Sequence, residues 1–212
     1  MNEPEAPIPA VPDALDALIK DGVLRRYRKS GVIISEGDAG TSFFILLEGT
    51  VRIYSQDEHG RELNFGQLEP RALFGEMALE GGTRTASVEA MTPCVCAEVP
   101  YALLKSRLAE SPDFAFLLIS TLIGRSRSAT ESAKNLALKT VYQRVVELLE
   151  KESVQEDGSR VLPRKMTQQE IANTVGASRD MISKIMKDLT IGKYIEVAEK
   201  RITILKDLPS RW

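Results

Sequence analysis

The chain has 212 residues, of which 43% are hydrophobic, and its formal net charge is −2 at pH 7. A chain of this length can bury one large core or two modest ones, and we expect two domains. No apolar run approaches the roughly 20 residues of a membrane helix, and the acidic, Pro-rich N-terminus lacks the pattern of a signal peptide, so we expect a cytoplasmic protein.

Charge is distributed unevenly along the chain. Residues 160–212 carry eleven Lys or Arg and six Asp or Glu, whereas residues 1–159 carry seventeen and twenty-four. A basic C-terminal part attached to a larger acidic part is typical of proteins in which only the smaller part approaches phosphate groups. A lysine-rich solvated surface would give the same asymmetry, so charge alone leaves nucleic-acid binding open.

The N-terminal half is predicted to be all-β. Residues 1–13 offer little to bury and are expected to form a disordered tail. Over residues 22–99, short runs rich in Val, Ile and Phe alternate with glycines, which predicts hairpins folded into a small barrel or jelly roll. His59 lies in a polar turn and is expected to be solvated rather than a metal ligand. Cys94 and Cys96 share one face of a strand, where we expect them to be buried.

After Pro100 the pattern becomes helical, with a short helix and then a longer one that restarts at Pro112. Along the longer helix, small and apolar residues recur in steps of four and three, as in a heptad seam. Because small side chains let two helix backbones come close, we predict a dimerisation helix. A helix that lies on its own β-domain could use the same stripe. The predicted seam consists of Ala115, Ile119, Leu122, Ser126, Ala129, Ala133, Leu136 and Thr140.

The C-terminal region carries the pattern of a helix-turn-helix. A helix over about residues 139–152 precedes the turn-rich segment QEDGSR. Thr167 can cap the next helix, Gly176 suits a sharp turn with positive φ, and Ser178 can cap a second helix. The segment YIEVAEKRITIL predicts two strands of a wing. A helical hairpin with a merely polar face is the alternative. The predicted DNA contacts are Thr167, Gln168, Gln169, Ser178, Arg179, Asp180, Ser183 and Lys184.

Together these segments resemble the cyclic-AMP receptor protein/fumarate-nitrate regulator superfamily of bacterial transcription factors. The resemblance runs from about residue 15 and rests on EGDAGTSFFILLEGTVRIY, GEMAL…RTA, NLALKTVYQRV and TQQEIANTVGASRDMISKIMKDL. It implies an α+β fold with a cyclic-nucleotide-binding β-roll over residues 14–110, a dimerisation helix over 111–138 and a winged helix-turn-helix over 139–212. It also implies a homodimer that binds a double-stranded DNA operator, with RNA polymerase as a further partner.

The stretch GEMALEGGTRT, residues 75–85, has the chemistry of a phosphate site, and we call it the phosphate cassette. Gly75 permits a tight turn into one helical turn, so the N–H groups of Glu76, Met77 and Ala78 can face an anion while Arg84 adds a cation. Glu76 can accept a hydrogen bond from a sugar hydroxyl, so a cyclic nucleotide would satisfy both groups. The resemblance adds Thr85 as a phosphate contact. A buried Glu76–Arg84 ion pair between two loops is the structural alternative.

The effector is less closely defined by the sequence. Well-known cyclic-AMP responders of this family place a Thr-Ser pair ahead of Asn-Leu-Ala, whereas this chain has Ala129-Thr130 ahead of Asn135. Thr130 is expected to contact the base, but the missing hydroxyl removes a contact of roughly 0.5–1.5 kcal/mol. Cyclic AMP is therefore the first choice, with cyclic GMP, cyclic di-GMP or no nucleotide as alternatives. An iron–sulfur sensor would need about four cysteines, and the chain has two, so this class of sensor is disfavoured.

The function predicted from these residues is allosteric control of DNA binding by a cyclic nucleotide. We expect no catalytic residue and no metal site, because a jelly-roll metalloenzyme needs a cluster of His and carboxylate ligands and the chain has one histidine. The competing possibilities are a ligand-independent DNA-binding regulator and a nucleotide-sensing adaptor whose winged helix binds protein. Asp180 and Lys184 replace the family's Glu and Arg, which implies an altered DNA half-site.

Overall fold

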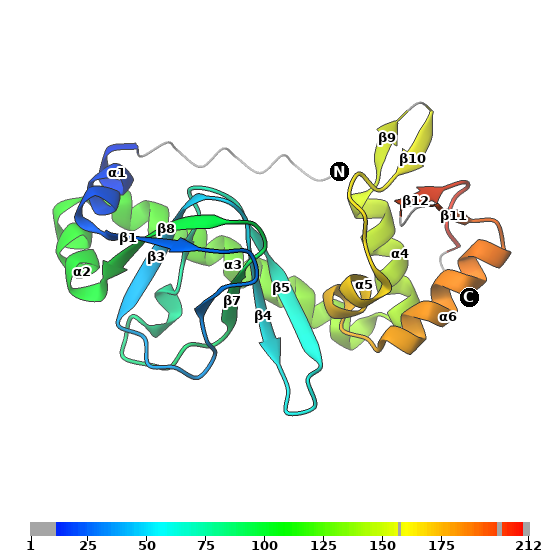
Figure 1. Ribbon diagram of the computed structural model, residues 1–212, viewed down its shortest axis with the longest axis horizontal. Helices are drawn as coiled ribbons and strands as arrows, with labels where there is room; N and C mark the ends of the chain where they lie inside the picture. Colours follow the sequence, from blue (N-terminus) through cyan, green and yellow to red (C-terminus); the bar gives the residue numbers. More distant parts are fainter. Residues whose placement is uncertain (1–11, 157, 199–200, 210–212) are drawn as a thin grey trace. The chain divides into compact units, whose positions relative to one another are not determined.

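The run SFFILLE forms strand β3 (Ser42–Glu48) in the computed structural model, which describes residues 12–156, 158–198 and 201–209 (Figure 1). Residues 42–46 are all buried because β3 has a packed layer on each face. Phe43 and Ile45 contact a helical layer, and Phe44 and Leu46 contact a second sheet. The alternation of a strand therefore puts every side chain of this apolar run into one of two cores.

Two four-stranded sheets form the β-roll, with strand orders β1-β8-β3-β6 and β2-β7-β4-β5. The chain divides into a first unit, residues 1–55 and 65–129, and a second unit, residues 56–64 and 130–212. The predicted barrel or jelly roll is confirmed as this pair of sheets. The strands are β1 (Val23–Tyr27), β2 (Val32–Ile34), β4 (Val51–Gln56), β5 (Glu62–Leu68), β6 (Leu73–Phe74), β7 (Ser87–Ala90) and β8 (Cys94–Pro100).

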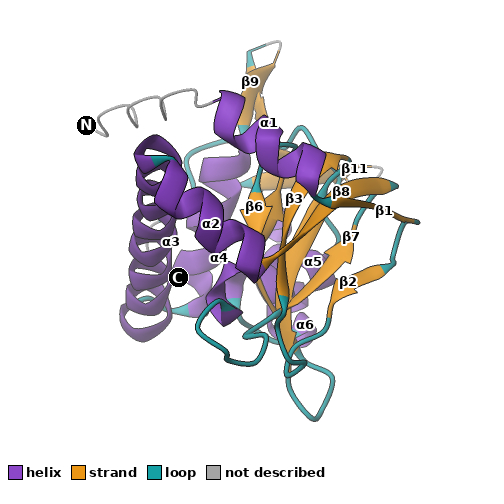
Figure 2. Cartoon of the chain, turned by 90° about the vertical axis from the view of Figure 1, so that its left-hand side faces the viewer, coloured by secondary structure: helices purple, strands orange, loops and turns teal. Residues whose placement is uncertain are grey.

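Helices α1 (Pro12–Asp21) and α2 (Tyr101–Glu110) and the first part of α3 (Pro112–Leu138) cover the outer side of the β3 and β8 sheet, as Figure 2 shows. The sequence pattern did not predict α1, whose first residues fell within the expected disordered tail; residues 1–11 of that tail lie outside the described residues. None of the helices formed by the described residues is long and apolar enough to span a membrane.

Helix α3 has two apolar faces. Phe114 and Leu118 are buried in the core of the first unit, whereas Phe116, Ile119, Leu122 and Ile123 are 62%, 52%, 38% and 49% exposed. The predicted seam residues Ile119, Leu122 and Leu136 are thus exposed in a single copy of the chain, whereas Phe114 and Leu118 pack on the β-roll. The last predicted member of the seam was placed wrongly: Thr140 lies beyond the end of α3 and is the N-cap of the following helix.

The second unit is a winged helix-turn-helix, as predicted. Thr140 and Thr167 each form a capping box, with Gln143 and Glu170 respectively. Where QEDGSR indicated only turns, the structure has a short hairpin, which joins the wing in the strand order β11-β12-β10-β9. The elements are α4 (Val141–Glu152), β9 (Val154–Glu156), β10 (Ser159–Val161), α5 (Gln168–Val175), α6 (Arg179–Ile191), β11 (Ile195–Ala198) and β12 (Arg201–Ile204).

Both cysteines are free and buried in the core between the two sheets, as expected for small apolar residues. Burial raises the pKa of the Cys96 thiol to about 12, with a smaller contribution from Cys94, so this thiol stays protonated at neutral pH. His59 is exposed at the tip of the β4–β5 hairpin, as predicted. Among the described residues, no group of His, Cys, Asp and Glu is arranged to hold a metal ion.

Candidate functional site

The phosphate cassette begins with the tight turn that the sequence predicts. Gly75 has φ +85° and is the N-cap of a single 3₁₀ turn, η1 (Glu76–Ala78), with no side chain capping its N–H groups. A Cβ atom at position 75 would lie 2.8 Å from Nη1 of Arg84. Glycine is therefore required both by the backbone conformation and by the close approach of the arginine. The uncapped N-terminal end of η1 can donate to an anion.

Arg84 lies beneath this turn and is only 8% exposed. Its Nη1 donates to the carbonyl oxygen of Gly75 at 2.7 Å and to the Tyr101 hydroxyl at 3.0 Å, and its Nη2 donates to the carbonyl oxygen of Ser42 at 2.7 Å. The Tyr101 hydroxyl in turn donates to Gly75 at 2.5 Å. These bonds use three of the five guanidinium donors, which fixes the cation and leaves two donors for a ligand. Burial raises the pKa of Tyr101, so its hydroxyl remains a neutral donor.

Glu76 is tied to the long helix rather than to Arg84. Its side chain is 6% exposed, and its Oε1 lies 2.5 Å from Nη1 of Arg125 on α3. Arg125 also donates to the carbonyl oxygen of Leu73. The alternative of a direct Glu76–Arg84 ion pair is not found among the described residues. Arg125, which is not among the residues predicted for the site, is thus the partner of the cassette carboxylate.

The other predicted ligand contacts differ in position. Met77 is 68% exposed, and the Thr85 hydroxyl lies 3.3 Å from its sulfur, so both are at the surface of the cassette. Thr130 is exposed on the part of α3 that belongs to the second unit. The structure therefore brings together six of the seven predicted ligand residues in the first unit: Gly75, Glu76, Met77, Ala78, Arg84 and Thr85.

The predicted DNA contacts lie at the start of α5 and along the exposed side of α6. Arg179, Asp180, Ser183 and Lys184 are all exposed, opposite the buried side of α6 that contains Ile182, Met186 and Leu189. Thr167 and Ser178 are N-caps, whose hydroxyls accept from the N–H groups of Glu170 and Met181. Gln169 is exposed and donates to Asn173 at 2.7 Å, and Gln168 is half-buried.

The turn between α5 and α6 is fixed by a residue that the sequence pattern did not indicate. Arg144 of α4 donates from Nε to the carbonyl oxygen of Val175 and from Nη1 to that of Lys139, each at 2.8 Å, and from Nη2 to Gly176 at 3.4 Å. Gly176 has φ +64°, the positive value that was predicted for this sharp turn. One guanidinium therefore connects the helix-turn-helix turn to Lys139, which lies between α3 and α4. Backbone acceptors leave no sequence signal, so spacing alone could not reveal this role.

Two family models match the chain, one over each of the two regions just described. The family model described as a cyclic nucleotide-binding domain matches residues 24–111, and that of a Crp-like helix-turn-helix domain matches residues 143–208. The cAMP-activated global transcriptional regulator Vfr of Pseudomonas aeruginosa is 31% identical over 201 residues, which cover 90% of this chain and 92% of that protein. The cAMP-activated regulator CRP of Pasteurella multocida is 27% identical over 204 residues, covering 92% and 96%.

Two solved structures show the same fold. A c-di-GMP responsive global regulator, CLP of Xanthomonas campestris, superposes with a TM-score of 0.81 at 24% identity and covers 92% of this chain and 99% of its own. A transcriptional regulator of the CRP/FNR family from Thermus thermophilus superposes with a TM-score of 0.64 at 28% identity, covering 87% and 94%. Proteins similar to this chain are therefore named for different effectors: cAMP for Vfr and CRP, and c-di-GMP for CLP.

Proposed function

The chain belongs to the cyclic-AMP receptor protein/fumarate-nitrate regulator superfamily of DNA-binding transcription regulators, and on that basis we propose that cyclic AMP binds its β-roll and controls the affinity of a homodimer for a near-palindromic operator. The observation that carries this proposal is the phosphate cassette, in which a glycine turn with uncapped N–H groups lies over a fixed arginine. The proposal also includes contact between the DNA-bound protein and RNA polymerase, and a cytoplasmic location.

A cyclic nucleotide fits the donors and acceptors of the cassette. Its phosphate would accept from the N–H groups at the start of η1, from the remaining donors of Arg84 and from the Thr85 hydroxyl. A sugar hydroxyl would donate to Glu76, and Thr130 would contact the base. Because Glu76 also accepts from Arg125, such a ligand would act on an ion pair that joins the cassette to α3. This connection is the proposed route from the ligand to the dimer.

The exposed apolar face of α3 supports the homodimer. Phe116, Ile119 and Leu122 are too large and too exposed to be ordinary isolated surface residues of a monomer, and they follow one another on consecutive turns. A second copy of α3 would bury them across a two-fold axis. Two recognition helices would then be presented together, which requires DNA half-sites about one helical turn apart.

Calorimetric titration of the full-length protein with cyclic AMP, cyclic GMP and cyclic di-GMP tests the sensor. We expect cyclic AMP to bind, Arg84→Ala to weaken it by about a hundredfold and Thr85→Ala by about 1 kcal/mol, or roughly fivefold. Thr83→Ala, an exposed neighbour outside the proposed contacts, should bind as the original chain does. If the protein bound cyclic di-GMP or cyclic GMP more tightly, that nucleotide would replace cyclic AMP as the proposed effector. If none of the three bound, the protein would be a ligand-independent regulator.

Arg179→Ala should weaken operator binding by about 2 kcal/mol, or roughly thirtyfold, because Arg179 is the one side chain at the start of α6 with a bidentate fork for a guanine edge. The measurement is fluorescence anisotropy with operator and scrambled duplexes at fixed salt. The loss should be larger for the operator than for the scrambled duplex. Lys151→Ala, a charge removed from the exposed end of α4, serves as the control. Equal losses on both duplexes would show that Arg179 contacts phosphate and not a base.

A further inference from the structure

The tip of the β4–β5 hairpin, residues 56–64, belongs to the second unit together with the helix-turn-helix. The Glu62 carboxylate in this tip accepts a hydrogen bond from Nδ2 of Asn173 on α5 at 3.0 Å, although the two residues are 111 positions apart. A Cβ atom at Gly176, in the turn after α5, would lie 3.5 Å from Cδ1 of Leu63. The hairpin tip therefore lies against the helix and the turn that precede α6.

The hydrogen bonding continues from Asn173 to a predicted DNA contact. Nε2 of Gln169 donates to Oδ1 of Asn173 at 2.7 Å, across one turn of α5. The Asn173 amide thus donates to Glu62 and accepts from Gln169, and the two bonds together fix which way its oxygen and nitrogen point. We call Glu62, Asn173 and Gln169 the amide relay. Gln169 is exposed, so this end of the amide relay is open to solvent.

The amide relay leaves Gln169 able to donate to DNA. A glutamine amide has two N–H groups, and the bond to Asn173 uses one of them. The other can donate to a phosphate oxygen, the kind of contact that fixes a protein on the duplex. A mobile glutamine side chain loses rotamer entropy when it binds, and one that is already held loses less. Because Glu62 orients the amide that holds Gln169, a hairpin residue prearranges a predicted DNA contact.

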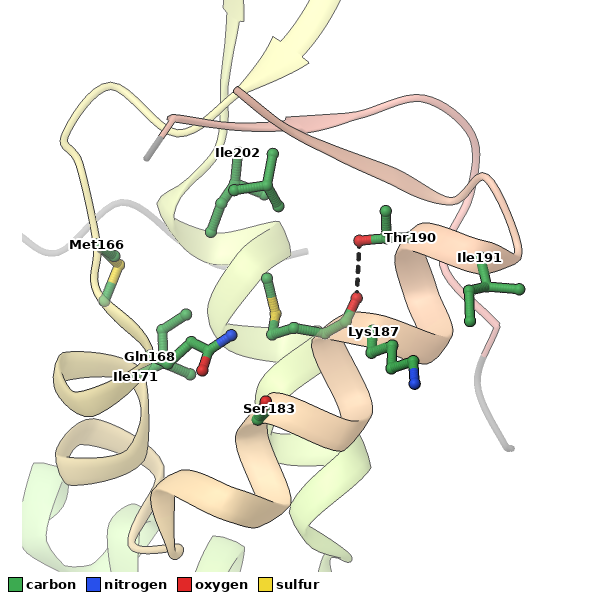
Figure 3. A pocket seen from close by; sticks show the side chains of 10 residues that line it. Met166, Gln168, Ile171, Ser183, Lys187, Thr190, Ile191 and Ile202 are labelled. Atoms are coloured by element: carbon green, nitrogen blue, oxygen red, sulfur yellow. Dashed lines mark hydrogen bonds between the residues drawn. The ribbon is translucent and has the colours of Figure 1, made fainter. Parts of the chain in front are cut away.

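The other glutamine at the start of α5 lies outside the amide relay. Gln168 lines a groove together with Ser183 of α6, and its amide extends toward α6 (Figure 3). The two adjacent glutamines are both predicted DNA contacts, but the hairpin acts on Gln169 through Asn173. Gln168 is therefore a matched control for Gln169.

We propose that Glu62 and Asn173 are positioning residues for operator binding, which act through Gln169. This role rests on the proposed function, because Gln169 must contact DNA for the amide relay to change operator affinity. Residues 56–64 connect strands β4 and β5, so operator affinity would depend on a segment that lies outside the helix-turn-helix in sequence. If instead the carboxylate of Glu62 only repelled DNA phosphates, removing it would strengthen operator binding.

The amide relay is tested without DNA or nucleotide, by the NMR signals of the Gln169 side-chain amide in the full-length protein. Glu62→Ala should shift these signals toward those of a free glutamine, because Asn173 loses its acceptor. Glu62→Gln should keep them close to those of the original chain, because glutamine retains an oxygen that accepts from Asn173. Glu58→Ala, which removes an exposed carboxylate from the same hairpin, is the control. Unchanged Gln169 signals in Glu62→Ala would overturn the amide relay.

The positioning role is tested by fluorescence anisotropy with operator duplex at fixed salt, with and without cyclic AMP. Glu62→Ala should weaken operator binding about fivefold, whereas Glu62→Gln and Glu58→Ala should bind like the original chain. Adding Glu62→Ala to Gln169→Ala should have no further effect, but adding it to Gln168→Ala should cost the same factor again, because only Gln169 belongs to the amide relay. Equal further losses in both backgrounds, or tighter binding by Glu62→Ala, would overturn the positioning role.

The same measurements separate this role from the proposed function. If the original chain bound no duplex, the proposed function would fail, and the positioning role would fail with it. If the original chain bound the operator and Gln169→Ala bound it equally well, only the positioning role would fail.

Discussion

Replacing Arg125 with glutamine is expected to destabilise the first unit by about 3 kcal/mol. The Glu76 side chain is 6% exposed, and Arg125 is the only ion-pair partner that the described residues give it. Removing the arginine would leave a buried carboxylate without a counter-charge. We expect the lower end of the usual range for a broken buried pair, because Arg125 itself is 31% exposed. Urea unfolding, with hydrogen exchange of the β3 amides as the probe of the first unit, measures the loss.

Arg127→Gln is the matched control, since Arg127 is on the same helix, exposed, and outside this ion pair. It should change stability by less than about 0.5 kcal/mol. The double variant Glu76→Gln with Arg125→Gln should recover most of the loss, because the buried charge is then gone as well. If Arg125→Gln behaved like Arg127→Gln, the Glu76–Arg125 pair would not hold the cassette to α3, and the proposed route from ligand to dimer would fail.

Features encoded by local chemistry could be predicted from the sequence. Gly75 and Gly176 have the positive φ values that their tight turns required, and Thr167 and Ser178 cap the helices that they precede. Each of these predictions depends on residues within four positions of one another, where backbone geometry and capping dominate. The short Val-, Ile- and Phe-rich runs between glycines, which predicted the strands, are similarly local.

The partners of the cassette could not be predicted in the same way. Glu76 and Arg125 are 49 positions apart, and Arg84 donates to carbonyl groups of Gly75 and Ser42, which every residue type possesses. The structural alternative, a Glu76–Arg84 pair, joined two charged residues that are close in sequence, and the structure pairs Glu76 with Arg125 instead. What decides the pairing is the packing of α3 against the β-roll, which brings Arg125 over the turn.

Weakly patterned elements were also missed. Helix α1 begins at Pro12 within a Pro-rich, acidic stretch, and its stabilisation comes from Leu15 and Leu18, which are buried against α2 and β8. Strands β9 and β10 have three residues each and are mostly exposed, so they show no alternation that a pattern could detect. In both cases tertiary contacts outweigh local propensity.

Gly40→Ala should cost about 2–3 kcal/mol of stability and abolish cyclic-nucleotide binding, because the cassette has no room for the added methyl group. A Cβ atom at position 40 would lie 2.3 Å from Cβ of Ala78, 3.2 Å from the Tyr101 hydroxyl oxygen and 3.3 Å from Cζ of Arg84. None of the three can easily give way: Ala78 is 1% exposed, and Arg84 and Tyr101 are joined by hydrogen bonds to Gly75. The methyl group must displace η1 or the guanidinium.

Thermal unfolding and nucleotide titration of Gly40→Ala and Gly82→Ala provide the comparison. Gly82 lies in the loop that precedes Arg84, and a Cβ atom there would have no neighbour within 4 Å and no positive φ to strain. The Gly82 variant should therefore bind and unfold like the original chain. If Gly40→Ala also did so, η1 and Arg84 would move apart without cost, and a rigidly held arginine could not be the basis of phosphate binding. If instead Gly40→Ala kept its stability but lost the nucleotide, the cassette would be a binding element that contributes little to the fold.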